Sequence, residues 1–167
     1  MVAGDYVLGD FEFYKSKQPD SGDLVVFSTT NGDSFVFRII GMPYDTIDIE
    51  KQLVKFKNKK SSDKLISTLL CNEYQTEEFL ETLPNGFKYR IYRNKTTIFA
   101  KKATIKGLVV PADSYFVLGD NRDLSDDSRF IGFVRREQIH GKLLSLYFRA
   151  DFSKINKKYN RIRVTQN

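Results

Sequence analysis

The sequence has very little cysteine and histidine, which narrows the chemistry it can support. Cys71 is the only cysteine, so neither an internal disulfide nor a cysteine metal cluster can form. His140 is the only histidine and the only acid–base group of the usual neutral-pH kind. A catalytic Cys71–His140 pair is an alternative, but we expect separate core or surface roles because the two lie in different parts of the chain. We expect no metal and no cofactor. One cysteine suits a reducing compartment and an exported protein equally, so the compartment stays open.

Long apolar runs are also absent. No stretch is long enough to span a bilayer, and no segment has the apolar centre of a signal peptide. Hydrophobic residues make up 41% and charged residues 29%, a balance that favours a globular core over disorder. The chain as given is therefore predicted to be soluble.

Negative charge is outweighed by positive charge, and the formal net charge is +6. Residues 153–167 form a basic C-terminal tail, which we expect to be a solvated end segment. An anionic membrane surface, a wall polymer or nucleic acid are alternative partners for it. A basic β-barrel that binds nucleic acid is also conceivable, but no recognition signature of interleaved aromatic and basic residues accompanies the charge, so we expect no nucleic acid partner. The tail's basic residues are Lys154, Lys157, Lys158, Arg161 and Arg163.

What the sequence does contain is a series of short apolar runs separated by Gly, Asp and Asn, which predicts a mostly β fold. In Ser34–Ile40, alternation places Phe35, Phe37 and Ile39 on one face. Asn31-Gly32 predicts a hairpin with a type I′ turn, and Asn85-Gly86 predicts a second hairpin. The expected strands are Asp5–Leu8, Leu24–Ser28, Ser34–Ile40, Phe79–Leu83, Lys88–Tyr92, Tyr115–Leu118 and Lys142–Phe148.

The middle of the chain is less regular. Leucine and isoleucine recur at helical spacing in Asp63–Leu70, so a short helix is expected there. The overall pattern predicts a core β domain formed by residues 1–47 and 113–152, with a smaller β domain inserted at 48–112.

The most specific string is Gly119–Arg129, which reads GDNRDLSDDSR. It leaves an apolar strand and carries four carboxylates, two guanidinium groups and two hydroxyls, so we expect an ordered loop of mutually satisfied charges. It does not fit a calcium loop, because Arg122 and Leu124 occupy places where oxygen ligands would alternate.

This string resembles the signature of type I signal peptidases, the S26 family of serine peptidases. Further blocks match that family in order along nearly the whole chain, so the resemblance rests on much more than one short motif. It implies an antiparallel β fold with an inserted β region, tethered by an N-terminal membrane helix and lying on the outer face of the membrane. It also implies a serine–lysine dyad, in which an un-ionised lysine takes the serine proton. The other matched blocks are Gly4–Leu8, Gly22–Phe27, Arg38–Asp45, Val110-Pro111 with Tyr115–Leu118, and Gly141-Lys142.

The sequence departs from the family at the dyad itself. The family's lysine directly precedes the arginine that Arg38 matches, and here that place is Phe37, which has no titratable proton. The nucleophilic serine lies several residues before the glycine matched by Gly4, so its position is expected to precede Met1, together with the membrane helix. Lys15 and Lys17 are nearby lysines, but their spacing places neither on the required strand face.

The former active-site loop keeps its other residues. By the resemblance, Ser125 corresponds to the serine near the lysine amine, and Asp127 and Arg129 to the pair that braces the loop. Asp120 and Arg122 open the motif. Without a lysine to orient, we expect these residues to hold the fold. A second departure is Tyr44, which replaces a turn glycine and, with Phe37, is expected to project into the cleft.

The resulting hypothesis is a non-catalytic, membrane-anchored homologue that binds extracytoplasmic protein or peptide segments. It is most similar to signal-peptidase-like accessory factors of Gram-positive pilus gene clusters, which implies a chaperone-like role in pilus assembly with pilin subunits as partners. The alternative is an active serine endopeptidase that cleaves signal peptides with a serine upstream of Met1 and a relocated base. The residue at the nucleophile position distinguishes the two.

Overall fold

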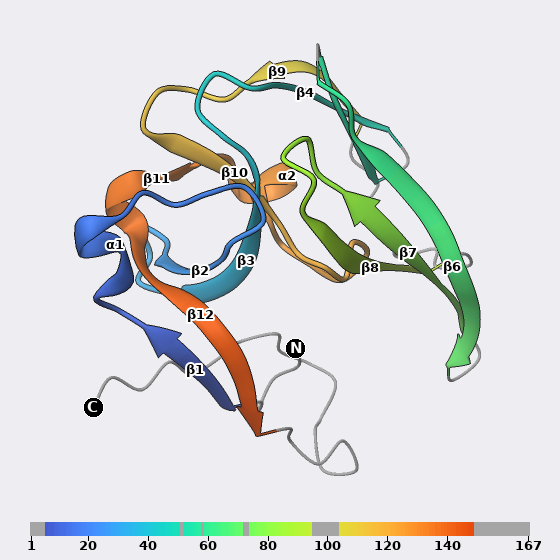
Figure 1. Ribbon diagram of the computed structural model, residues 1–167, viewed down its shortest axis with the longest axis horizontal. Helices are drawn as coiled ribbons and strands as arrows, with labels where there is room; N and C mark the ends of the chain where they lie inside the picture. Colours follow the sequence, from blue (N-terminus) through green and yellow to red (C-terminus); the bar gives the residue numbers. More distant parts are fainter. Residues whose placement is uncertain (1–5, 51, 58, 72–73, 95–103, 149–167) are drawn as a thin grey trace.

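The chain consists largely of strands joined by short turns (Figure 1). The computed structural model describes residues 6–50, 52–57, 59–71, 74–94 and 104–148. The prediction of a mostly antiparallel β protein is confirmed. The elements are β1 (Tyr6–Asp10), α1 (Phe13–Ser16), β2 (Leu24–Ser28), β3 (Ser34–Gly41), β4 (Thr46–Glu50), β5 (Leu53–Phe56), β6 (Ser62–Cys71), β7 (Tyr74–Thr82), β8 (Lys88–Asn94), β9 (Ile105–Val109), β10 (Ser114–Leu118), α2 (Ser128–Ile131), β11 (Val134–Arg135), the 3₁₀ turn η1 (Arg136–Gln138) and β12 (Ile139–Phe148).

The largest sheet has six strands in the order β1-β12-β2-β3-β10-β11, with antiparallel neighbours throughout. Strands β1 to β3 come from the first part of the chain and β10 to β12 from the last. The long strand β12 lies between β1 and β2, and the β1–β12 pair extends away from the rest of the molecule (Figure 1). Long-range pairing therefore joins the two parts of the chain in one sheet.

Strand β3 has two apolar faces. Phe35, Phe37 and Ile39 pack in one cluster with residues of β2, β10 and β12, as alternation predicted. The next residue, Ile40, belongs to a different cluster on the opposite face. A strand buried on both sides reads as a nearly continuous apolar run, which is the pattern of FVFRIIG.

Two three-stranded sheets are formed by the strands between Thr46 and Val109, in the orders β5-β4-β9 and β6-β7-β8. One buried cluster joins them to the large sheet, since it contains Ile40 and Phe116 together with Ile47 and Ile91. The division into a core and an inserted domain stays a prediction, and the apolar core is continuous between these sheets.

Both expected hairpins form, although the first does not have the predicted turn type. At the β2–β3 turn only Gly32 has positive φ, at 82°, and its amide donates to the Thr29 carbonyl at 2.9 Å. A type I′ turn would need positive φ at Asn31 as well. The observed geometry is that of a type I turn followed by a left-handed glycine, and Gly86 at the β7–β8 turn repeats it with φ 85°.

The prediction of a helix at Asp63–Leu70 is wrong, because this segment belongs to β6. It pairs with β7 from Ser62↔Thr82 to Cys71↔Tyr74. Leu65 and Ile66, which the helical interpretation would place on a buried stripe, are both exposed. Hydrogen bonds to a neighbouring strand therefore decided the conformation, and the helical spacing of apolar residues was coincidental.

Candidate functional site

The Gly119–Arg129 loop begins where β10 leaves the large sheet, and Asp127 organises its first part. The Asp127 carboxylate accepts hydrogen bonds from the Gly119 amide at 2.9 Å and, as the N-cap of α2, from the Arg129 amide at 3.2 Å. It also forms a two-pronged ion pair with the Arg129 guanidinium, at 2.7 and 2.8 Å, and both side chains are fully buried. Arg129 in turn donates to the Arg122 carbonyl at 2.6 Å. Asp127 and Arg129 thus tie the two ends of the loop together.

Arg122 is the largest fully buried side chain of the described structure, and it connects the loop to the small sheets. Its guanidinium meets Glu81 of β7 at 2.5 and 3.1 Å and the Tyr89 hydroxyl of β8 at 2.9 Å. It also donates to the carbonyl oxygens of Gln52 and Gly119 at 2.9 and 3.2 Å. A buried charge is tolerated only when it is paired and hydrogen-bonded, and Glu81 and the two carbonyl oxygens supply both kinds of contact.

Asp120 pairs with an arginine outside the loop. Arg38 of β3 forms two parallel hydrogen bonds with its carboxylate, at 2.9 and 2.7 Å, and donates a third to the Gly22 carbonyl at 2.8 Å. The Arg38 guanidinium also lies 4.6 Å from the centre of the Tyr89 ring. The four charged loop residues named from the sequence are therefore all engaged in contacts that hold sheets and loop together.

Ser125 and Phe37 both approach Gly119. A Cβ placed on Gly119 would lie 1.9 Å from the Ser125 hydroxyl oxygen and 3.5 Å from the Phe37 ring. The Ser125 hydroxyl donates to the Asn121 carbonyl at 2.6 Å. The position that the resemblance assigns to the family's lysine therefore holds an aromatic ring, and the Ser125 hydroxyl is hydrogen-bonded within its own loop.

The Phe37 ring is one of three in a compact aromatic group. Its centre lies 5.7 Å from that of Phe35 and 5.9 Å from that of Phe27. Such spacings are typical of favourable aromatic pairs. Phe37 is therefore packed as part of an apolar cluster.

Tyr44 occupies its glycine-type turn in a left-handed conformation with φ 68°, and its side chain is 74% exposed. Its amide donates to the Val110 carbonyl at 2.8 Å, which holds the turn in place. A left-handed backbone is costly for a bulky residue. The ring extends into solvent.

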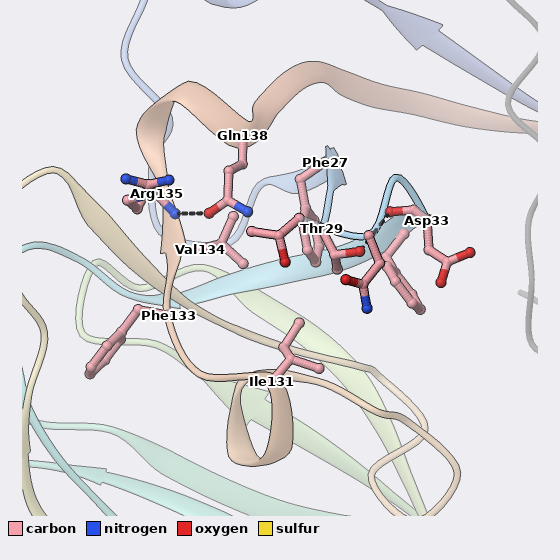
Figure 2. A pocket seen from close by; sticks show the side chains of 11 residues that line it. Phe27, Thr29, Asp33, Ile131, Phe133, Val134, Arg135 and Gln138 are labelled. Carbon is pink, nitrogen blue, oxygen red and sulfur yellow. Dashed lines mark hydrogen bonds between the residues drawn. The ribbon is translucent and has the colours of Figure 1, made fainter.

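A cavity of about 530 Å³ opens beside the aromatic group (Figure 2). Phe27 and Phe35 form one apolar wall, and Ile131, Phe133 and Val134 form another. Figure 2 shows Phe27, Thr29 and Val134 gathered around its interior, with Arg135 and Gln138 at one side. Neither Phe37 nor Tyr44 lines this cavity, so it does not coincide with the cleft position expected from the sequence. Its remaining lining residues are Thr29, Thr30, Asn31, Asp33, Arg135 and Gln138.

The structure separates the other candidates. His140 of β12 lies 3.0 Å from the Ser28 hydroxyl, measured from Nε2. Cys71 ends β6 in a different sheet. Lys15 pairs with Glu12 at 2.7 Å, and the amine of Lys17 lies 4.4 Å from the centre of the Phe13 ring. Among the described residues, no group of three His, Cys, Asp or Glu side chains is placed to hold a metal ion.

Several residues that complete the loop were not identified from the sequence. Glu81, Tyr89 and Gln52 surround Arg122, yet they precede it by 41, 33 and 70 residues. In the sequence, Glu81 and Tyr89 are ordinary strand residues of the predicted hairpin at Asn85-Gly86. The available signal was strand alternation, because Glu81 shares a strand face with Phe79 and Leu83, whose apolar side chains predict a buried side.

A second, partly buried polar network joins α1 to β12. The Tyr14 hydroxyl donates to the Asp23 carboxylate at 2.8 Å, and the other Asp23 oxygen pairs with Lys142 at 2.6 Å. Burial raises the pKa of the Tyr14 phenol well above its usual range, and the hydrogen bond to Asp23 raises it further. Burial raises the pKa of Tyr92 and of Tyr115 as well.

These shifts predict a loss of stability at alkaline pH. Above about pH 10 the unfolded chain releases the Tyr14 proton while the folded chain keeps it, so the free energy of unfolding falls as pH rises. A single such phenol contributes a slope of up to about 1.4 kcal/mol per pH unit. Urea unfolding of Tyr14→Phe at successive alkaline pH values should show a shallower decline than the wild type. An unchanged decline would mean that this phenol ionises in the folded protein.

Comparisons with known proteins indicate the same family as the sequence motifs. The profile for "Signal peptidase, peptidase S26" matches residues 1–148. The signal peptidase I of Rickettsia rickettsii (strain Sheila Smith) is 34% identical, over 86% of this chain and 60% of its own length. That of Rickettsia typhi (strain ATCC VR-144 / Wilmington) is 33% identical over the same shares. The chain thus spans about three fifths of the length of these relatives.

A solved structure is also similar, the signal peptidase I of Enterococcus faecalis V583, with 24% identity and a TM-score of 0.47 over 77% of this chain and 98% of that one. In the part of the chain that the structure describes, no helix is both long and apolar enough for a membrane span. The family of the chain is shown by the profile match over residues 1–148 and by the identity to the rickettsial enzymes. The chain belongs to the signal peptidase family, peptidase S26.

Proposed function

We propose that this protein binds extended segments of exported proteins at the outer face of the membrane without cleaving them. The observation that carries the proposal is Phe37, whose ring packs against Phe27 and Phe35 where the family's general base would stand. A benzyl group cannot accept a proton at any pH, so the family's dyad chemistry has no base here.

The nearby lysines do not supply a substitute. The amine of Lys15 is engaged by Glu12, and that of Lys142 is paired with Asp23. An un-ionised lysine base requires an apolar setting that disfavours its charge. Both amines lie instead against carboxylates, and Lys15 is 71% exposed, so neither has that setting.

The open edge of β3 supports the binding half of the proposal. Strand β2 pairs with Ser34–Arg38, whereas β10 pairs only from Arg38 to Gly41. Among the described strands, none pairs with the second edge of β3 at Ser34–Phe37. An unpaired edge is a template for strand addition, in which backbone hydrogen bonds give affinity and pockets select side chains.

The cavity of Figure 2 lies beside this edge, since Phe35 belongs to both. Its walls of phenylalanine, isoleucine and valine suit an apolar side chain of the bound segment, and Gln138 and Arg135 at the side suit its polar backbone. A signal peptide or an apolar pilin segment would meet these requirements. The pilin itself, and a chaperone-like role in pilus assembly, come from the resemblance to accessory factors of pilus gene clusters.

Activity is tested with the full-length protein against a pre-pilin and a standard signal-peptide substrate. We expect no cleavage of either, measured by mass spectrometry of the products. Cleavage that disappears when a serine upstream of Met1 is replaced would establish the alternative, an active signal peptidase with a relocated base.

Binding is tested by fluorescence anisotropy with labelled extended peptides. Ile131 lines the cavity and is 40% exposed, so Ile131→Asp should place a charge there and weaken binding by about tenfold or more. Leu65→Asp is the matched control, because Leu65 is 48% exposed on β6, away from the cavity. Equal losses for both variants, or none for either, would reject the cavity as the binding site.

A further inference from the structure

A second cavity, of about 320 Å³, lies between α1, η1 and β12. Its walls combine apolar and basic side chains. It shares no lining residue with the cavity of Figure 2 and lies beside α1. The lining residues are Phe11, Tyr14, Lys15, Arg136, Ile139 and His140.

Arg136 is the best-placed cation of this cavity. It is held by a 2.5 Å hydrogen bond from Nη2 to the Tyr14 carbonyl and a 3.3 Å bond from Nε to Gln18 Oε1. Both partners are neutral, and no carboxylate pairs with Arg136 among the described residues. Since a guanidinium has five N–H donors in a planar fork, this fixed group keeps donors for a ligand.

The remaining charges leave the cavity positive. Lys15 is paired with Glu12, but both side chains are more than 70% exposed, so this pair is weak and screened by solvent. Asp23, the acid beneath Tyr14, is already occupied by the Tyr14 hydroxyl and Lys142. His140 also lines the cavity, and its Nε2 lies 3.0 Å from the Ser28 hydroxyl.

We propose that this cavity binds a phosphate group carried on an organic body, either a free phosphate ester or a phospholipid headgroup. The fork of Arg136 suits two phosphate oxygens, and Lys15 supplies a mobile counter-charge. The apolar walls formed by Phe11, Tyr14 and Ile139 suit the organic part. The inference is independent of peptide binding, because no residue of the β3 edge takes part.

Binding to the 167-residue chain is measured by NMR titration with glycerol 3-phosphate, and separately by flotation with phosphatidylcholine vesicles with and without phosphatidylglycerol. We expect saturable shifts at Ile139, His140 and the Arg136 side chain. Arg136→Gln should weaken binding about tenfold, the loss expected for a charge-assisted contact. Because Arg136 also donates a hydrogen bond to the Tyr14 carbonyl, the thermal unfolding of each variant is measured as well. A further variant, Arg136→Lys, keeps the positive charge but lacks the planar fork of donors.

Lys15→Gln and Lys55→Gln form a matched pair at the surface. Lys15 is 71% and Lys55 65% exposed, and each pairs with one glutamate, but Lys55 lies in β5. The site is supported if Lys15→Gln weakens phosphate binding and Lys55→Gln does not. If the variants weaken only the binding of glycerol 3-phosphate, the ligand is a free phosphate ester. If they also reduce flotation with vesicles that contain phosphatidylglycerol, the ligand is a phospholipid headgroup. If neither probe distinguishes Arg136→Gln and Lys15→Gln from Lys55→Gln, the proposal is wrong.

Discussion

Replacing Arg122 by methionine is expected to lower the free energy of unfolding by about 3–5 kcal/mol, the cost of breaking a buried ion pair by removing one partner. The change leaves the Glu81 carboxylate, which is 3% exposed, without its counter-charge. It also removes the donors that satisfy the buried carbonyl oxygens of Gln52 and Gly119. A domain of ordinary stability has only about 5–15 kcal/mol in total, so this one substitution should take much of it.

Chemical denaturation measures the loss, and two further variants identify its origin. In the double variant Arg122→Met with Glu81→Met, no buried charge is left alone, so the combined loss should be smaller than the sum of the single losses. Lys55→Gln disrupts an exposed pair with Glu50 and should cost less than about 1 kcal/mol. Additive losses in the double variant would show that Arg122 and Glu81 do not depend on each other.

Gly119→Ala is expected to be the second severe substitution, with a loss of about 3 kcal/mol, the upper part of the range for overpacking. The added methyl would lie 1.9 Å from the Ser125 hydroxyl oxygen and 2.4 Å from its Cβ. Ser125 cannot withdraw freely, because it is 8% exposed and its hydroxyl is bonded to the Asn121 carbonyl. The loop must therefore shift, and the Gly119 amide that donates to Asp127 shifts with it.

The same denaturation assay can separate the clash from a backbone effect. Ser125→Gly removes both clashing atoms, so Gly119→Ala should cost less in that background than in the wild type. The Phe37 ring, at 3.5 Å, would remain in ordinary contact with the new methyl. If Gly119→Ala is equally costly with glycine at position 125, contact with Ser125 is not the cause.

Together these predictions assign a structural role to the loop. Its ion pairs run to α2, to β3 and to the β7–β8 hairpin, and the contacts that hold each arginine do not involve Phe37. A loop with this role would persist in a chain without a catalytic lysine, because its loss would remove the ion pairs between the large sheet and the β7–β8 hairpin. The signature alone therefore does not distinguish an active enzyme from a binding protein.

Local patterns were predicted well because their causes are local. The alternation of Phe35, Phe37 and Ile39 follows from strand geometry, and the hairpins at Gly32 and Gly86 follow from the freedom of glycine at positive φ. The segment Asp63–Leu70 was predicted wrongly for the complementary reason. Its apolar spacing is helical, but its partner strand β7 lies beyond the window that defines that spacing.

The sequence by itself determined the family, the mostly β class and the absence of a lysine at Phe37. Each is written in consecutive residues or in the fixed register set by Arg38. Only the tertiary structure decided that Arg122 meets Glu81, that Tyr14 meets Asp23, and that the two cavities open where they do. These contacts depend on β12 inserting between β1 and β2 and on the packing of hairpins against the large sheet. Strand order and burial arise from the whole chain, and they leave no local periodicity from which such partners can be identified.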